Sequence, residues 1–532
     1  LIDDILPSKS IEKLVISLVL VAILLIARGG IGYIAGFFGI TQGKGFNNRL
    51  INRFFESLLH LPKSFFDNRR IGELVERMND TSRIQSAITA VVGDLLKNFL
   101  LVIIGEVVLF IYSPILGALS LGAFPLFGFI SWRYQKRIVA GQQEVMAANA
   151  HKSSNYVNSM QGIDAIKSGH KEEQFSKLNQ LIYGIYQDKI FSLGKVGLSL
   201  QLVAEIASVF ITIALISVGS WMVVRGSLTV GSLMAILGIS GNIFPAIVSL
   251  SFANISLQGA KVAFDRMYEF SSISPEFEHG VEVEDQLDDI SKVEVDNISF
   301  RFPGRKQLLK GVSIQIAKGE MVALLGESGC GKTTFLNILQ RFYSHEEGVI
   351  SVNGQSFTEI PIPAWRKRIG VVPQEVSIFN GSLIENICFQ STQEEMQKCV
   401  EFCMQTGFHQ YFMEFPHNYG TLLGEQGINI SGGQKQLVGL ARALWTKPKF
   451  LILDEPTSAM DRNTENFALK LLHTMKKDTC IMLVTHRIKI ARFSDQIYIL
   501  ENGQIEAQGR HEELMSTENL YSMSYEELIS HG

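Results

Sequence analysis

A glycine-rich loop between a strand and a helix is the first feature of the sequence that could do chemistry. The segment MVALL predicts a buried strand, FLNILQ predicts a helix, and a loop joins them. Glycines let backbone N–H groups surround phosphate oxygens, and the helix N-terminus adds partial positive charge. We predict a phosphate site in which Lys332 reaches the β- and γ-phosphates and the Thr333 hydroxyl binds Mg²⁺. The loop consists of Gly326, Glu327, Ser328, Gly329, Cys330, Gly331, Lys332, Thr333 and Thr334.

Two adjacent carboxylates follow a second predicted strand at residues 451–453. Beside a phosphate loop, Asp454 suits binding Mg²⁺ through water, and Glu455 suits polarising the water that attacks the γ-phosphate. A strand-terminal Asp-Glu pair on its own is more often an ordinary solvated strand end. The phosphate loop in the same chain makes the catalytic interpretation the favoured one.

A serine and two glycines open a further predicted helix, QKQLVGLARALW. In isolation, Ser431, Gly432, Gly433 and Gln434 indicate a plain capped helix start, which is also an anion-binding N-terminus. Together with the phosphate loop they resemble the signature motif of ABC transporter nucleotide-binding domains. Since one ATP needs only one phosphate loop, the resemblance implies that this helix closes on the γ-phosphate bound to a partner subunit.

The remaining motifs of that family appear in the expected order. Phe302 matches the aromatic residue that stacks on adenine, which is often Tyr in the family, and Gln374 matches the Q-loop glutamine that touches Mg²⁺. Residues 421–427 resemble an exporter-specific loop. Asp461 ends a segment that resembles the D-loop, and His486 matches the switch histidine. The resemblance covers nearly the whole chain and implies ATP and Mg²⁺ as cofactors. It assigns catalysis to Glu455, His486, Gln374 and Lys332, metal binding to Thr333, Gln374 and Asp454, and nucleotide binding to the other motif residues.

The cysteines indicate where this half of the chain resides. All five lie in the second half of the sequence: Cys330, Cys388, Cys399, Cys403 and Cys480. Their spacing fits neither a zinc site nor a secreted disulfide framework, which favours a reducing cytosol. Cys330 would lie near bound phosphate, so we expect its alkylation to block ATP hydrolysis by steric hindrance, without a catalytic role for the thiol.

Composition separates the chain into two parts. With 532 residues, at least two domains are expected. A net charge of -4 and a pI near 6.3 give no indication of nucleic-acid binding. The apolar excess lies almost entirely before about Phe270, and the rest resembles a soluble α/β domain.

Three apolar regions predict five membrane spans. Residues 13–41 are long enough for one span; residues 98–132 form two around the turn Ser113-Pro114; residues 197–253 form two more, separated near Gly226. The long polar segments between them are rich in Lys and Arg, whereas the turn at Pro114 has none and the turn at Gly226 has only Arg225. The positive-inside rule places the long segments and the C-terminal domain in the cytosol. We expect a multi-pass protein of the cytoplasmic membrane, with a sixth span upstream of Leu1.

The expected fold is an all-α transmembrane domain of the type I ABC exporter kind, followed by an α/β P-loop NTPase domain. The predicted bounds are 1–270 for the transmembrane domain, 271–290 for an acidic linker and 291–532 for the nucleotide-binding domain. Residues 134–190 have helical periodicity and predict two antiparallel helices that extend below the membrane and turn near Gly162 or Gly169.

The transmembrane half resembles bacterial peptide and bacteriocin exporters of the peptidase-containing group. The likeness lies in LPKSFFD, followed by RRIGE, and in GIDAIK. By analogy these turns contact the nucleotide-binding domain, although for any single residue an amphipathic surface turn is an equally ordinary interpretation. No cysteine precedes Cys330, so the cysteine peptidase of that group is not part of this sequence.

The resemblance implies ATP-driven export of a peptide or bacteriocin-like cargo by alternating access, as a homodimer or with a similar half-transporter. A lipid flippase or multidrug exporter of the same architecture is the alternative, and the spans disfavour a non-transporting ATPase. Glu106 and Glu205 interrupt apolar runs, where charge is costly. One hypothesis is that at least one of them lines the path of a basic cargo; the other is a structural or interfacial role.

Overall fold

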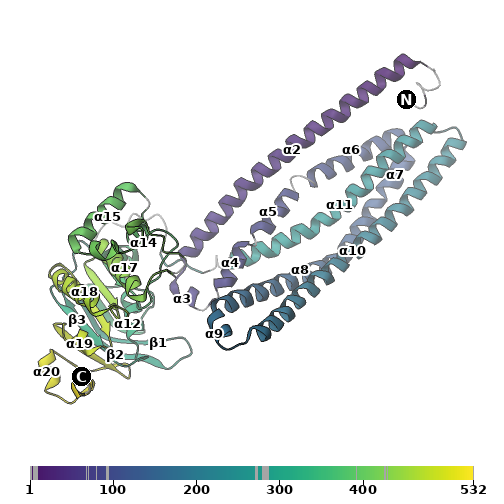
Figure 1. Ribbon diagram of the computed structural model, residues 1–532. Helices are drawn as coiled ribbons and strands as arrows, with labels where there is room; N and C mark the ends of the chain where they lie inside the picture. The colour runs from purple at the N-terminus through teal and green to yellow at the C-terminus, as the bar shows by residue number, and fades with distance from the viewer. Residues whose placement is uncertain are drawn as a thin grey trace. The chain divides into compact units, whose positions relative to one another are not determined.

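The computed structural model in Figure 1 describes residues 3, 10–67, 69, 71–79, 81–90, 95–269, 273–277, 287–390, 392–424, 427 and 429–530. The chain divides into two units, Leu1–Glu276 and Phe277–Gly532. The first unit is helical and the second combines sheets with helices, as the sequence predicts. The division falls inside the expected linker, whose residues 271–272 and 278–286 lie outside the described part. The finer domain bounds therefore stay predictions.

Short connections join the helices of the first unit. The helices are α2 (Ile11–Leu59), α3 (Lys63–Asp67), α4 (Ile71–Asn79), α5 (Thr81–Ala90), α6 (Leu96–Tyr112), α7 (Pro114–Leu121), α8 (Ala123–Gln161), α9 (Ile163–Ser168), α10 (Glu172–Val224) and α11 (Val230–Tyr268). The expected turn after α6 is confirmed, because Ser113 has extended backbone angles and its hydroxyl accepts a hydrogen bond from the Leu116 amide. Pro114 then occupies the first turn of α7, where a missing N–H costs nothing.

Four helical stretches in the described part of the chain are long and apolar enough to cross a membrane. They are Ile11–Leu59, Pro114–Gln161, Glu172–Val224 and Val230–Leu250. The fifth expected span corresponds to α6, which has 17 helical residues and begins two residues after the last of residues 91–94, which lie outside the described part. That is slightly short of the roughly 20 residues that cross a bilayer core. The count of five spans stays a prediction.

The long hairpin of α8 and α10 has the geometry that the periodicity predicts. The two helices run side by side in Figure 1, and Lys189 of α10 pairs with Glu144 of α8 at 2.8 Å. Both candidate turn positions are used, because Gly162 ends α8, Gly169 ends α9, and the short helix α9 lies between them.

The surface of the first unit is apolar where its helices would meet lipid. None of the most apolar window of α2 is buried, and Ile26 is 75% exposed. Within the unit, α6, α7, α8, α10 and α11 enclose a core around Leu109, Leu116 and Ile243. Such a large exposed apolar surface is expected for helices whose solvent is the bilayer.

Two sheets form the frame of the second unit. The antiparallel sheet has the order β2 (Gln307–Ala317), β1 (Lys292–Arg301), β4 (Glu347–Val352) and β5 (Gln355–Ser356). The larger sheet has the order β10 (Gln504–Gly509), β9 (Gln496–Glu501), β3 (Met321–Leu325), β8 (Cys480–Thr485), β7 (Phe450–Asp454) and β6 (Ile369–Val372). In the larger sheet every neighbouring pair is parallel except β9 and β10.

Helices bury the larger sheet on both faces. The helices of the second unit are α12 (Lys332–Leu339), α13 (Ile362–Arg368), α14 (Leu383–Cys388), α15 (Gln393–Thr406), α16 (His409–Phe412), α17 (Gly432–Trp445), α18 (Arg462–Met475), α19 (Ile488–Ala491), α20 (His511–Met515) and α21 (Leu520–Ser530), with 3-10 turns at Asn418–Gly420 and Lys476–Asp478. Successive residues of β7 enter different cores: Ile452 packs in one and Leu453 in the other. The continuous apolar run of this strand reflects burial on both faces.

Candidate nucleotide-binding site

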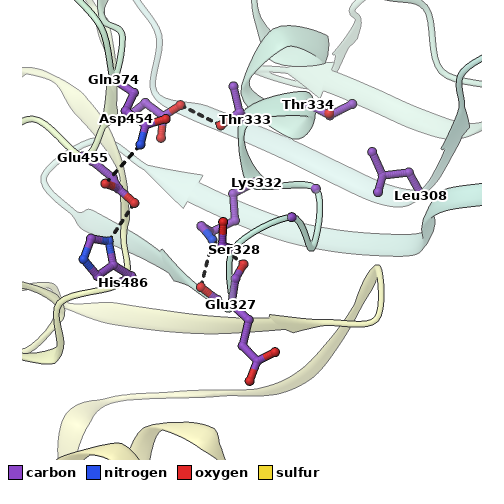
Figure 2. Close-up of a pocket in the computed structure, with 13 residues that line it drawn as sticks. Leu308, Glu327, Ser328, Lys332, Thr333, Thr334, Gln374, Asp454, Glu455 and His486 are labelled. Atoms are coloured by element: carbon purple, nitrogen blue, oxygen red, sulfur yellow. Dashed lines mark hydrogen bonds and ion pairs between the residues drawn. The ribbon is translucent and has the colours of Figure 1, made fainter. Parts of the chain in front are cut away.

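A pocket of about 520 Å³ lies at the carboxyl ends of β3, β7 and β8, which are adjacent in the sheet. Parallel sheets commonly bind ligands at this edge, because the loops that follow the strands converge there. Its lining residues are Leu308, Gly326, Glu327, Ser328, Gly329, Gly331, Lys332, Thr333, Thr334, Gln374, Asp454, Glu455 and His486 (Figure 2). Four separate motifs of the sequence thus meet in one cavity, and Leu308 is its one lining residue that the sequence did not single out.

The loop after β3 has the backbone that a phosphate cradle requires. Gly329 and Gly331 have φ angles of 84° and 111°, which L-residues with a side chain rarely adopt. A Cβ on Gly331 would also lie 2.8 Å from Leu309 Cδ2. Lys332 begins α12, and its ammonium donates hydrogen bonds to the carbonyl oxygens of Gly326 (2.8 Å) and Glu327 (2.7 Å). A buried ammonium beside open amides fits an incoming phosphate.

Thr333 and Asp454 form a hydroxyl–carboxylate pair across the pocket. The Thr333 hydroxyl donates to Asp454 Oδ2 at 2.9 Å (Figure 2). Burial raises the pKa of Asp454, and the nearby Glu455 adds to that rise, whereas the Thr333 hydrogen bond opposes it. The described residues contain no group of three or more His, Cys, Asp or Glu side chains able to hold a metal ion. A Mg²⁺ ion here would take a few protein oxygens and complete its shell with phosphate and water, which is its usual preference.

Glu455 is held by contacts on both carboxylate oxygens. Its Oε1 lies 2.7 Å from His486 Nδ1, and its Oε2 accepts a 3.4 Å hydrogen bond from the Gln374 amide (Figure 2). The backbone of Glu455 is left-handed, with φ at 48°, and its amide donates to Val484 O at 2.9 Å. Strained backbone of this kind is characteristic of functional sites. The arrangement points a carboxylate into the pocket as a general base would require.

Gln436 is a functional residue that the sequence did not reveal. It lies on α17 and is 4% exposed. Its amide nitrogen donates to Glu455 O at 3.1 Å and to Ser458 Oγ at 2.8 Å, while its oxygen accepts from the Ala459 amide at 2.9 Å. Gln436 therefore fixes the backbone on the far side of Glu455. A polar residue inside the apolar run QLVGLARALW was the signal that could have found it.

Two predicted residues lie outside this pocket. Phe302 packs edge to face against Phe300 and Tyr343, with ring centroids 5.0 and 5.5 Å apart. Cys330 lines a neighbouring hollow with Gln307 and Glu501. Its sulfur lies 3.9 Å from the Lys332 ammonium. Adenine stacking by Phe302 stays a prediction.

The signature residues and Asp461 are also outside the pocket. Ser431 caps α17: its hydroxyl accepts from the Gln434 amide at 3.2 Å, and Gln434 Oε1 accepts from the Ser431 amide at 2.9 Å. A Cβ on Gly433 would lie 2.8 Å from Ala459 O, so this position requires glycine. Asp461 caps α18 through the amides of residues 463 and 464. The capped helix N-terminus that the serine and glycines predict on their own is present. Contact between this N-terminus and a phosphate bound to a partner subunit stays a prediction. Of the exporter loop, Glu425 and Gln426 lie outside the described residues.

Two protein families match the chain. The family described as ABC transporter transmembrane region matches residues 1–247, and the family described as ABC transporter matches residues 309–458. The first match covers most of the helical unit, and the second begins in β2 and ends just after Glu455. Together they account for both units.

Individual proteins show the same organisation. The alpha-hemolysin translocation ATP-binding protein HlyB of Escherichia coli O157:H7 is 29% identical over 481 residues, which is 89% of this chain and 67% of that protein. The leukotoxin export ATP-binding protein LtxB of Aggregatibacter actinomycetemcomitans is 30% identical over 481 residues, 88% of this chain and 66% of that protein. This chain thus spans about two thirds of the length of these relatives.

A solved structure confirms the expected fold class. A bacterial Atm1-family ABC exporter with ATP bound has a TM-score of 0.84 over 91% of this chain and 85% of its own, with 22% identity. At that identity the likeness supports the fold alone: helical transmembrane domain first, α/β domain second.

Proposed function

Since this chain belongs to the ABC transporters, as a half-transporter with a transmembrane domain followed by one nucleotide-binding domain, we propose that it exports a polypeptide cargo across the cytoplasmic membrane. ATP hydrolysis coupled to transport is its enzymatic activity. The observation that carries the assignment of the catalytic site is the convergence of the phosphate loop, Asp454, Glu455 and His486 on one pocket. The nucleotide-binding domain acts in the cytosol.

Each residue of the pocket has a role in the proposed reaction. The loop amides and Lys332 bind the β- and γ-phosphates of ATP, with Lys332 leaving its carbonyl partners for phosphate oxygens. Glu455 accepts a hydrogen bond from the attacking water and orients it in line with the γ-phosphate. His486 and Gln374 hold the Glu455 carboxylate and lie within reach of the same phosphate.

Thr333, Asp454 and Gln374 would hold Mg²⁺. The ion supplies charge neutralisation of the β- and γ-phosphate oxygens when it is bound. Burial raises the pKa of Asp454, so a cation held at this position would stabilise its charged form. The hydroxyl–carboxylate pair fits the oxygen ligands that Mg²⁺ prefers.

The proposed active assembly is a dimer. Ser431, Gly432 and Gly433 lie outside the pocket that holds Glu455, so they remain available to close on a nucleotide bound by another chain. This sequence carries Glu455, His486 and the signature together, and a homodimer would therefore have two competent sites. A heterodimer with a similar half-transporter is the other arrangement.

Two observations support a polypeptide cargo. The segment LPKSFFD resembles peptide exporters, and the relatives above are named for the translocation or export of hemolysin and leukotoxin. Because these relatives are named for protein toxins, a polypeptide is the general cargo that we propose, and a bacteriocin-like peptide is its more specific form. Alternating access, in which dimer closure on two ATP molecules reorients the spans, is the proposed mechanism.

The first experiment is ATP hydrolysis by the full-length protein in proteoliposomes, with leader-bearing peptides and longer unfolded polypeptides added separately. Stimulation by one class, together with ATP-dependent protection of that class from external protease, is the expected result. Glu455→Gln should bind ATP and lower turnover by roughly 100-fold or more, the usual worth of a general base. Hydrolysis that ignores polypeptides and rises with lipids or hydrophobic drugs would overturn the cargo proposal in favour of a flippase or multidrug exporter.

A further inference from the structure

Glu106 is a buried carboxylate inside the helical unit. It lies on α6 and is 7% exposed, on the same face as Val102 and Leu109, which belong to the apolar core. Its Oε2 accepts a 3.0 Å hydrogen bond from the Ser120 hydroxyl of α7. Its Oε1 is buried without a hydrogen-bond partner among the described residues. The Ser120 hydroxyl is thus the only hydrogen-bond partner that the described residues offer the Glu106 carboxylate.

Charged groups on the neighbouring elements do not face Glu106. Helix α6 packs against α7 and α11, and Gly105 lies directly against Ile243 of α11. Helix α7, PILGALSL, has no titratable residue. The titratable residues of α11 are Lys261, Asp265, Arg266 and the terminal Tyr268. Lys261, the first of them, lies about 27 Å along the helix from Ile243.

The other charges and titratable groups nearby are equally remote. On α6 itself they are Lys97, nine residues back and about 13 Å along the helix, and Tyr112 at its end. Helix α10 packs on α7, and its residue Glu205 is exposed and accepts a hydrogen bond from Gln201 of the same helix at 2.9 Å. The described surroundings therefore supply no counter-ion to Glu106.

A carboxylate in this position is stable only with a ligand. A carboxylate ion without a cation beside it is strongly disfavoured in hydrocarbon, whereas the neutral carboxylic acid is disfavoured much less. A proton is the smallest ligand that removes the charge, and it needs no cavity. We propose that Glu106 and Ser120 form a proton-binding site within the membrane domain, loaded when α6, α7 and α11 are packed as they are here.

The site gives the transport cycle a proton step. When the helices close, the Glu106 carboxylate takes a proton from water at Oε1, and when α6 separates from α7 and water enters, the proton returns to water. The new Oε1–H bond forms as an O–H bond of a hydronium ion breaks and leaves a water molecule, and the release of the proton reverses this exchange. Because the cycle itself is part of the proposed function, this coupling rests on that proposal, whereas the loading of Glu106 does not.

The loading is tested on the full-length protein by infrared spectroscopy between about pH 5 and pH 9. We expect a C=O stretching band of a protonated carboxylic acid that titrates in the wild type and is absent from Glu106→Gln. Glu205→Gln is the matched control and should keep the band. Ser120→Ala should displace the titration, because the hydroxyl donor stabilises the charged carboxylate more than the neutral acid. A band that is unchanged in Glu106→Gln overturns the proton site, whatever the protein transports.

The coupling is tested by ATP hydrolysis in proteoliposomes over the same pH range. The wild type should show one ionisation step that Glu106→Gln abolishes and Glu205→Gln retains. Superimposable wild-type and Glu106→Gln profiles would overturn the coupling. Loss of stimulation by basic peptides in Glu106→Gln at every pH would overturn it as well, and would assign Glu106 to the cargo path instead.

Discussion

Asp454 and Glu106 are two buried carboxylates that share the same kind of hydrogen-bond partner, a hydroxyl group, but differ in whether their surroundings are polar or apolar. Each accepts one hydrogen bond from a hydroxyl, Asp454 from Thr333 at 2.9 Å and Glu106 from Ser120 at 3.0 Å. Asp454 faces a pocket of about 520 Å³ that also contains the Lys332 ammonium. Glu106 faces an apolar core, with no cation on the described residues around it.

The difference shows that the space and charge around a carboxylate, rather than its closest hydrogen bond, decide which ligand it can take. Beside an open polar pocket, a buried Asp can share a hydrated divalent ion with phosphate. In hydrocarbon with no room for an ion and its water, a proton is the ligand that remains. The experiments below test this contrast, from the largest expected effect to the smallest.

Amide substitution should separate the two carboxylates most clearly. Asp454→Asn removes a proposed metal ligand and should lower ATP hydrolysis roughly 100-fold or more, since metal charge stabilisation is worth several kcal/mol. Glu106→Gln imitates the protonated acid and should leave hydrolysis far closer to the wild type. Steady-state hydrolysis at saturating Mg²⁺ and ATP measures both. Equal losses in the two variants would remove the contrast.

A thiol reagent tests whether the phosphate loop is open as the pocket implies. Cys330 is partly exposed, whereas Cys388, Cys399, Cys403 and Cys480 are buried. A maleimide should lower hydrolysis at least about 10-fold by occupying space beside the loop, and ATP should protect. The Cys330→Ser variant should have the same activity before and after treatment with the maleimide. Equal inactivation of both proteins would place the reactive thiol elsewhere.

Gln436→Leu tests how much the support behind Glu455 contributes. The substitution leaves Glu455 O, Ser458 Oγ and the Ala459 amide without a shared partner. A loss of about 1.4 kcal/mol, or 10-fold in kcat, is expected with little change in KM for ATP. Gln436→Glu keeps the acceptor for Ala459 but buries a carboxylate against Glu455 O, so it should lose at least as much. A change in KM alone would show that Gln436 acts on binding.

The smallest effect concerns a pH dependence that belongs to neither carboxylate. Burial lowers the pKa of His345 below its ordinary value of 6.5. The folded state therefore favours the neutral ring, so this residue should reduce stability as the pH falls through about 6.5, where the unfolded chain takes up the proton. His345→Gln should reduce the fall in the melting temperature between about pH 7 and pH 5.5. The His345→Gln variant should keep the ionisation step that Glu106 gives to the pH profile of ATP hydrolysis. If this variant lost that step, the step would report unfolding of the protein and not the protonation of Glu106.

The sequence predicted the parts of the site that depend on local spacing. The phosphate loop directly follows β3, Asp454 ends β7 and Glu455 comes next, so recognising the two strands places these residues at the carboxyl edge of the sheet. The turn at Ser113-Pro114 was equally predictable, because a serine cap and a proline in the first helical turn act within a few residues.

Contacts between distant segments could not be predicted. Gln436 is recognisable as a support for Glu455 only when α17 is placed beside β7, and the Ser120 partner of Glu106 depends on how tightly α7 folds back on α6. The left-handed backbone of Glu455 leaves no trace in its residue type, because Glu ordinarily avoids that conformation.

That backbone angle also makes residue 455 informative about evolution. Glycine and asparagine adopt a left-handed conformation more readily than glutamate, which bears about 1 kcal/mol of strain there. In the proposed mechanism, selection for hydrolysis would retain the glutamate against the gain in stability from replacing it. A sister half-transporter that carries glycine or asparagine at the corresponding position has been released from that selection. The residue type there is thus a marker, readable from a genome, of which subunit in an unequal pair still turns over ATP.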